Sequence, residues 1–196
     1  MANHTFTREN ALTLMHKHVQ SPGLRKHMLA VEAAMVDYAQ EMDGDPHAWG
    51  LAGLLHDFDW ELHPTAEEHP VAGVPILRTA GVPEDVIEAI LGHADHSGIP
   101  RTTLMARALY ACDEITGLIT AAALIRPSRS ILDLEVRSVR KKWKNPRFAA
   151  SVDRQQIEAA AEEFGVDLWG SHVAHVIQSM RRIAADLDLA GNADAG

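Results

Sequence analysis

A histidine and an aspartate stand side by side at His56-Asp57, where an apolar run ends. Successive helical positions diverge by only about 100°, so a metal ion in a crevice between helices could use both side chains. Burying an imidazole beside a carboxylate is costly unless each group is paired or coordinated. Two more potential ligands, His27 and Asp113, belong to other predicted helices. Imidazole and carboxylate together suit iron, manganese, zinc or magnesium, so these four residues predict a divalent-metal site.

Helices must position these ligands, because apolar residues recur at helical spacing along nearly the whole chain and strand-like alternation is scarce. Ser21-Pro22 predicts a helix start, with serine as N-cap and proline in the first turn. Thr65–Glu68 resembles a capping box. The predicted helices cover residues 7–18, 22 to near 44, 46–56, 65–81, 83–93, 102–125, 133–143, 153–164 and 172–187.

The predicted fold is therefore all-α, a helical bundle with a helical C-terminal extension. We expect one domain over residues 1–190, in which a metal-binding core at about 20–130 precedes a helical cap at about 131–190. Residues 191–196 are small and polar and are predicted to form a flexible tail.

Composition narrows the class of function. The formal net charge of −9 argues against a protein dedicated to nucleic-acid polymers. A single cysteine, Cys112, excludes an internal disulfide and fits a reducing compartment. Residues 1–5 lack the features of a signal peptide, and no apolar run reaches the roughly 18 residues that span a membrane. We expect a cytoplasmic protein that binds neither nucleic-acid polymers nor membranes; homodimer formation stays open.

The order of a histidine, then His-Asp, then a distant aspartate resembles the HD-domain superfamily of metal-dependent phosphohydrolases, over roughly residues 24–130. The stretch Leu54–Asp59 is similar to the family's apolar-apolar-His-Asp-apolar-Gly motif. His69–Gly73 resembles the His-Pro-x-x-Gly segment of the two-metal phosphodiesterase branch, known as HD-GYP, and His93 stands where that branch places a further ligand. Two later segments are similar to the family's Ala-Asp and Arg-Pro-x-Arg elements: Ala111–Ile115 and Arg126–Arg129.

The resemblance implies a metal-dependent phosphohydrolase with a small phosphoester substrate such as a nucleotide. Position by position, it implies one divalent metal held by His27, His56, Asp57 and Asp113. A second metal, bridged by Asp57, would be completed by His69 and His93. Two metals would clamp a phosphate and lower the pKa of a bridging water. The number of ions, and their identity among iron, manganese, zinc, nickel and magnesium, stay open.

Side chains near the ligands are candidates for supporting roles. Glu32, Asp59 and Glu61 could accept a hydrogen bond from a ligating histidine. The predicted catalytic carboxylates are Asp57, Asp59 and Glu61, and an outer carboxylate or a histidine would handle the leaving group. The predicted substrate-binding cations are Arg25, Lys26, Arg101 and Lys141, the last from the basic segment 137–147, which could instead be a solvated helix face.

Three positions depart from the phosphodiesterase branch: Asp59 replaces a glycine, Trp60 replaces a phosphate-binding lysine, and Gly98-Ile99-Pro100 shortens the Gly-Tyr-Pro motif. These departures argue against cleavage of cyclic dinucleotides. The missing lysine favours a first alternative, a two-iron oxygenase resembling inositol oxygenase, which would use the same six ligands to activate oxygen. The second alternative is a non-catalytic binding module stabilised by its metal.

Overall fold

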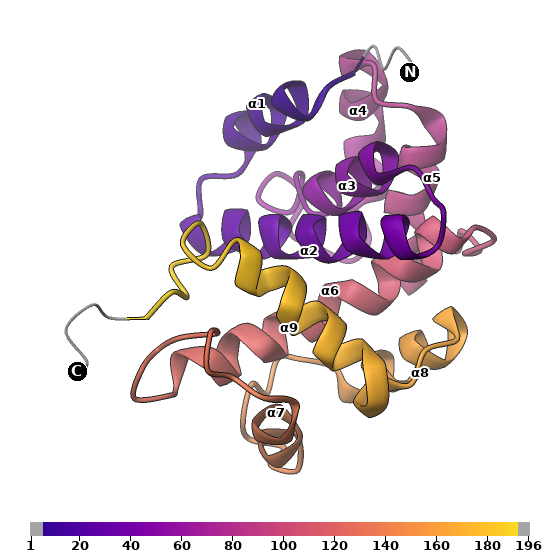
Figure 1. The fold of residues 1–196 in the computed structure, drawn as a ribbon. Coiled ribbons are helices and arrows are strands. Elements are labelled where there is room, and N and C mark those ends of the chain that lie inside the picture. The colour runs from indigo at the N-terminus through magenta and orange to yellow at the C-terminus, as the bar shows by residue number, and fades with distance from the viewer. Residues whose placement is uncertain (1–5, 192–196) are drawn as a thin grey trace. The chain divides into compact units, whose positions relative to one another are not determined.

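The structure is a computed structural model that describes residues 6–191. Within this range it contains helices and no β-strand (Figure 1), and its isolated antiparallel bridge joins Ser130 to Ala190. The predicted all-α fold class is confirmed. None of the described helices combines the length and the apolar character needed to cross a membrane. The tail predicted at 191–196 lies, apart from Gly191, outside the described residues.

The chain divides into two compact units between Tyr110 and Ala111, inside helix α6(Leu104–Leu124). The predicted organisation as one domain with a core and a cap stays a prediction.

The first unit is built around α3(Pro46–Leu55), in which every residue from Trp49 to Leu55 is buried. A helix that is buried on all sides belongs in the middle of a core. Three helices pack against it: α1(Arg8–His18), α2(Pro22–Glu41) and α5(Glu84–Gly92). The short helix α4(Val74–Ala80) contacts α5 in turn. The 3-10 helix η2(Asp95–Ser97) follows α5 and also contacts it.

Helices α2 and α3 approach each other closely at Gly53. A Cβ atom at this position would lie 2.8 Å from the backbone nitrogen of Glu32 and 2.9 Å from its Cα. Both distances are far inside van der Waals contact, so the backbones can come this near because residue 53 has no side chain. The crossing sets the spacing between His27 on α2 and His56 at the end of α3.

Two predicted helix starts are confirmed by their caps. The Ser21 side chain accepts a hydrogen bond from the Leu24 amide at the start of α2, and the Asp45 side chain accepts one from the His47 amide at the start of α3. Each helix has proline in its first turn, where the missing amide hydrogen costs nothing.

The helix predicted at 65–81 is wrong in its first half. Residues 66–70 form turns, the 3-10 helix η1(Val71–Gly73) follows, and α4 begins only at Val74. Pro70 cannot donate a backbone hydrogen bond and disfavours a continuous helix, whereas Pro75 sits in the first turn of α4, where proline is tolerated. His69 therefore lies on a turn.

The second unit holds the remainder of α6 with α7(Val136–Trp143), α8(Arg154–Phe164), the π-helix η3(Leu168–His172) and α9(Val173–Arg182). The helix predicted at 133–143 begins three residues late, at Val136, because the backbone of its N-cap residue Glu135 is extended. The helix predicted at 172–187 ends at Arg182, and turns follow up to Asp188, which has a left-handed φ of 54°.

Candidate metal centre

Four imidazoles surround the Asp57 carboxylate in two pairs. The Nε2 atoms of His27 and His56 are 3.1 Å apart, and so are the Nε2 atoms of His69 and His93. The first pair faces Oδ2 of Asp57 at 3.7 and 3.5 Å, and the second pair faces Oδ1 at 3.3 and 3.6 Å. One carboxylate thus lies between two pairs of nitrogen atoms.

His56 and His93 are each the C-cap residue of a helix, α3 and α5 respectively. Their Nδ1 atoms bond to the carbonyl three residues earlier, that of Gly53 at 2.8 Å and that of Ile90. A carbonyl only accepts, so Nδ1 must carry the hydrogen, and in a neutral ring the lone pair is on Nε2. These bonds give the helix-end carbonyls of Gly53 and Ile90 a side-chain donor and aim both Nε2 lone pairs at the site.

Asp59 orients the third imidazole. Its side chain is fully buried, and Oδ1 accepts a hydrogen bond from Nδ1 of His69 at 2.8 Å. An ionised carboxylate only accepts, so His69 also presents its Nε2 lone pair to the site. Of the three acceptors considered from the sequence, Asp59 makes this contact. The Glu32 carboxylate accepts from the Arg8 guanidinium instead, at 2.8 Å.

The geometry of the second pair fits a cation. Because both tautomers are set by Nδ1 bonds, the Nε2 lone pairs of His69 and His93 face each other at 3.1 Å, an arrangement that repels unless a proton or a metal ion separates them. Imidazole and carboxylate donors converging on one point are a common divalent-metal ligand set. The residues present therefore fit one.

Two pKa values reflect this crowding. Burial acts to raise the pKa of Asp57, but when the imidazoles also carry a proton on Nε2, the attraction of His56 and hydrogen bonds from His56, His69 and His93 outweigh it and hold the pKa well below its ordinary value. Burial acts to lower the pKa of His69, but hydrogen bonds with Asp57 and Asp59 outweigh it and raise the pKa to about 9. A metal ion must displace that proton.

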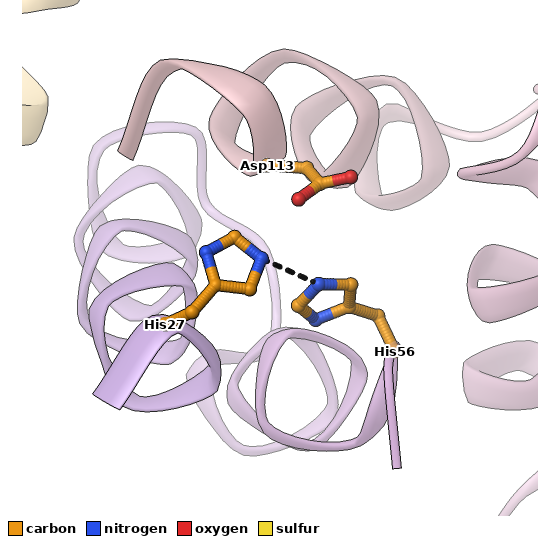
Figure 2. Close-up of side chains that lie close together, drawn as sticks. All are labelled: His27, His56 and Asp113. Carbon is orange, nitrogen blue, oxygen red and sulfur yellow. Dashed lines mark hydrogen bonds between the residues drawn. The ribbon is translucent and has the colours of Figure 1, made fainter. Parts of the chain in front are cut away.

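Asp113 is carried by α6, three residues beyond Tyr110, the last residue of the first unit. The helix is continuous across that division, so Asp113 lies about 4.5 Å along the axis from Tyr110. Ligand atoms of His27, His56 and Asp113 all lie within 4.8 Å of one another, and Figure 2 shows the three side chains together. The six predicted ligands thus form two groups, the second being Asp57, His69 and His93.

Residues 24–118 match the family model of the HD domain. The chain contains an HD domain. This assignment confirms the resemblance inferred from motif order, and the matched residues include all six predicted ligands. It places the chain in a superfamily of metal-dependent phosphohydrolases.

Curated relatives share this HD domain region. Over 98 residues, 50% of this chain, the sequence is 33% identical to Ribonuclease Y of Nitratidesulfovibrio vulgaris and 29% identical to Ribonuclease Y of Oleidesulfovibrio alaskensis. The chain spans only 18% of the length of each of these relatives. No solved structure matches the chain.

Two of the cations predicted to bind substrate hold loops near the HD domain's ligands. Arg25 donates to the Val19 carbonyl at 2.7 Å. Arg101 donates to the Gly92 carbonyl at 2.9 Å and lies over the ring of Tyr110, 3.7 Å from its centroid. Gly92 precedes the ligand His93, so Arg101 supports the end of α5.

The other predicted site residues are placed as follows. Lys26 is half-buried on α2 beside His27, and Lys141 is exposed on α7 in the second unit. Both carboxylate oxygens of Glu61 accept backbone N–H groups, those of Gln20 and Ser21. The catalytic and substrate-binding roles of these residues stay predictions.

The sequence interpretation missed one support of the predicted site. Gly53 permits the helix crossing because it has no side chain, and its carbonyl orients His56. The available signal was a glycine three residues before a predicted ligand in a buried helix. The sequence also suggests His96 as a less certain neighbour of the second metal, and in the structure its Nε2 contacts the carbonyl of His69.

Proposed function

We propose that this protein is a metal-dependent phosphohydrolase that acts on a small phosphoester such as a nucleotide, by attack of metal-activated water on phosphorus. The observation that carries the proposal is the Asp57 carboxylate between two pairs of imidazoles, of which His56, His69 and His93 present Nε2 lone pairs to the site. The HD domain supports it. So does the name of the curated relatives, ribonuclease, which denotes chemistry at a phosphoester.

Bound divalent metal would supply Lewis-acid chemistry and a water with a lowered pKa. One ion would be held by His27, His56, Asp57 and Asp113, and a second by Asp57, His69 and His93. Asp57 keeps its negative charge near neutral pH because its pKa is held low, so it would act as a metal ligand and not as a proton donor. Asp59 keeps His69 in the ligating tautomer.

Proton delivery to the leaving oxygen is assigned to the predicted carboxylates Asp59 and Glu61. Each would have to leave a contact that the structure shows. Asp59 would release His69, and Glu61 would release the amides of Gln20 and Ser21. Glu61 is exposed, so its release is the less costly of the two.

Elemental mass spectrometry and ester hydrolysis on the same samples test the proposal. We expect one or two divalent ions per chain, and metal-dependent release of product from p-nitrophenyl phosphate, its diester or a panel of nucleotides. Asp57→Ala should lose both metal and activity. Asp85→Ala is the matched control, because this exposed aspartate stands in the first turn of α5, about 12 Å along the helix axis from His93 at its other end. Metal-loaded protein that hydrolyses none of these esters would contradict the proposal.

A second candidate is a two-iron oxygenase acting on a small molecule. It is favoured by two observations: the six ligands fall into two groups, and the position of the branch's phosphate-binding lysine holds Trp60. About two iron atoms per chain, with oxygen consumption and no ester hydrolysis, would select this function. Bound metal that raises the melting temperature without either activity would indicate a non-catalytic binding module.

A further inference from the structure

Trp60 lies against a metal ligand while much of its side chain stays exposed. Its ring centroid is 5.0 Å from that of His69, and the two rings are nearly perpendicular, at 88°. Trp60 is 41% exposed, whereas His69 is 3% exposed. The Trp60 amide donates to the carbonyl of Asp57 at 3.1 Å. The turn that follows Asp57 therefore sets the backbone position from which the indole extends.

The turn that carries Trp60 is anchored on both sides. Asp59 is fully buried and bonded to a metal ligand. Glu61 accepts the amides of Gln20 and Ser21 at 2.7 and 2.8 Å, which ties the turn to the start of α2. With both neighbours held, the indole is presented from a fixed backbone. A fixed, exposed aromatic face loses little freedom when a flat group stacks on it.

An indole cannot neutralise a phosphate as a lysine does, so any contact of Trp60 with a substrate would be with a part other than the phosphate. Aromatic side chains bind nucleobases by stacking, which tolerates any base because every base has a π-face. The corresponding gain in affinity is about 5- to 150-fold per base.

We propose that Trp60 is a substrate-stacking residue, and that the natural phosphoester carries a nucleobase or a similar flat aromatic group near its phosphorus. This inference rests on the proposed function, because it names the substrate class of the same site. The simpler alternative is that Trp60 only covers His69. Any bulky apolar side chain would serve for that, whereas stacking requires an aromatic ring.

A binding experiment separates these roles without requiring turnover. Isothermal titration calorimetry of the metal-loaded protein would measure the affinity for adenosine 5′-monophosphate and for ribose 5-phosphate, which carries the same phosphate and sugar without the base. We expect the nucleotide to bind about 5- to 150-fold more tightly to the wild type. Trp60→Leu should remove this difference and Trp60→Phe should keep most of it.

The matched control is Leu62→Ala, because Leu62 is 44% exposed on the same turn and carries no ring. It should keep the full preference for the nucleotide. Melting temperatures of all variants would show that the proteins are folded. Where hydrolysis is measurable, Trp60→Leu should raise KM for the nucleotide with little change in kcat.

Equal affinity of the wild type for the two ligands would overturn the inference, and this result does not depend on any variant. A preference that survives in Trp60→Leu would overturn it as well. The two proposals can fail separately. A base preference without hydrolysis would leave the stacking role standing and refute the phosphohydrolase, whereas hydrolysis without base preference would do the reverse.

Discussion

Substituting alanine for Gly53 tests whether the crossing of α2 and α3 sets the metal geometry. The new Cβ would lie 2.8 Å from the backbone nitrogen of Glu32, whereas ordinary contacts begin at 3.4 Å. The difference, 3.4 − 2.8, requires the helices to separate locally by about 0.6 Å. The atoms that Cβ meets are backbone, so no rotamer change can relieve the clash.

The expected cost combines two opposing effects. Overpacking in a core costs about 1–3 kcal/mol, and alanine returns about 1 kcal/mol of helix propensity relative to glycine. The net loss of up to about 2 kcal/mol lowers the melting temperature by up to about 8 °C for a chain of this size. A shift of about 0.6 Å also exceeds the tolerance of about 0.5 Å for a ligand set, and it moves the carbonyl that orients His56, so metal affinity should fall about 10- to 100-fold.

Chelator competition would measure the affinity for Mn²⁺, and differential scanning calorimetry the melting temperature. Gly23→Ala is the matched control on α2, because its Cβ would lie 3.6 Å from the Ser21 Oγ, an ordinary contact that requires no movement of the helices. Gly23→Ala should leave metal affinity near that of the wild type. If Gly53→Ala binds Mn²⁺ as the wild type does, the reasoning that the crossing sets the ligand geometry is refuted.

Three further outcomes follow from the site and its supports. Asp59→Ala should lower Mn²⁺ affinity about 10- to 100-fold, because His69 loses the acceptor that sets its tautomer; Glu61→Gln is the control, and equal losses in both variants would contradict this role. Mn²⁺ affinity should rise about tenfold per pH unit up to the His69 pKa of about 9, because the raised pKa means that a proton must leave before the metal binds. Calorimetry in buffers of different ionisation enthalpy should count about one released proton at neutral pH, and a pH-independent affinity would be inconsistent with the raised pKa. Arg8→Met should lower the free energy of unfolding in urea by about 1–3 kcal/mol, because the Glu32 side chain, only 8% exposed, loses its guanidinium partner. Adding Glu32→Met should recover part of the loss. An unchanged urea midpoint in the single variant would argue against the pairing.

Local signals predicted much of the fold. The starts of α2 and α3 are encoded by a polar cap followed by proline, which act within one turn and need no tertiary information. The same reasoning failed at Thr65–Glu68, where the pattern of a helix start is real but Pro70 interrupts its continuation. One proline therefore prevents the helix that the capping pattern at its start predicts.

The candidate ligands could be predicted because they form a sequence motif. The order of His27, His56-Asp57 and the later ligands is visible along the chain, and the structure brings those residues into two groups. The residues that hold these ligands in place could not be predicted in this way, because they depend on contacts between segments that are far apart in the sequence. The pairing of Glu32 with Arg8 joins residues 24 positions apart, and no local pattern indicates which of several carboxylates finds which partner.

The two histidines that end α3 and α5 limit which residues could replace them. Aspartate and glutamate can coordinate a cation, but as carboxylates they only accept hydrogen bonds. Either would therefore place a negative charge beside the partial negative charge of the helix-end carbonyl oxygen. A cysteine coordinates as a thiolate and has no hydrogen left to donate. An imidazole offers a donor on one edge and a lone pair on the other, so exchanging either histidine for a different ligand type would weaken the helix end even where it preserved the metal.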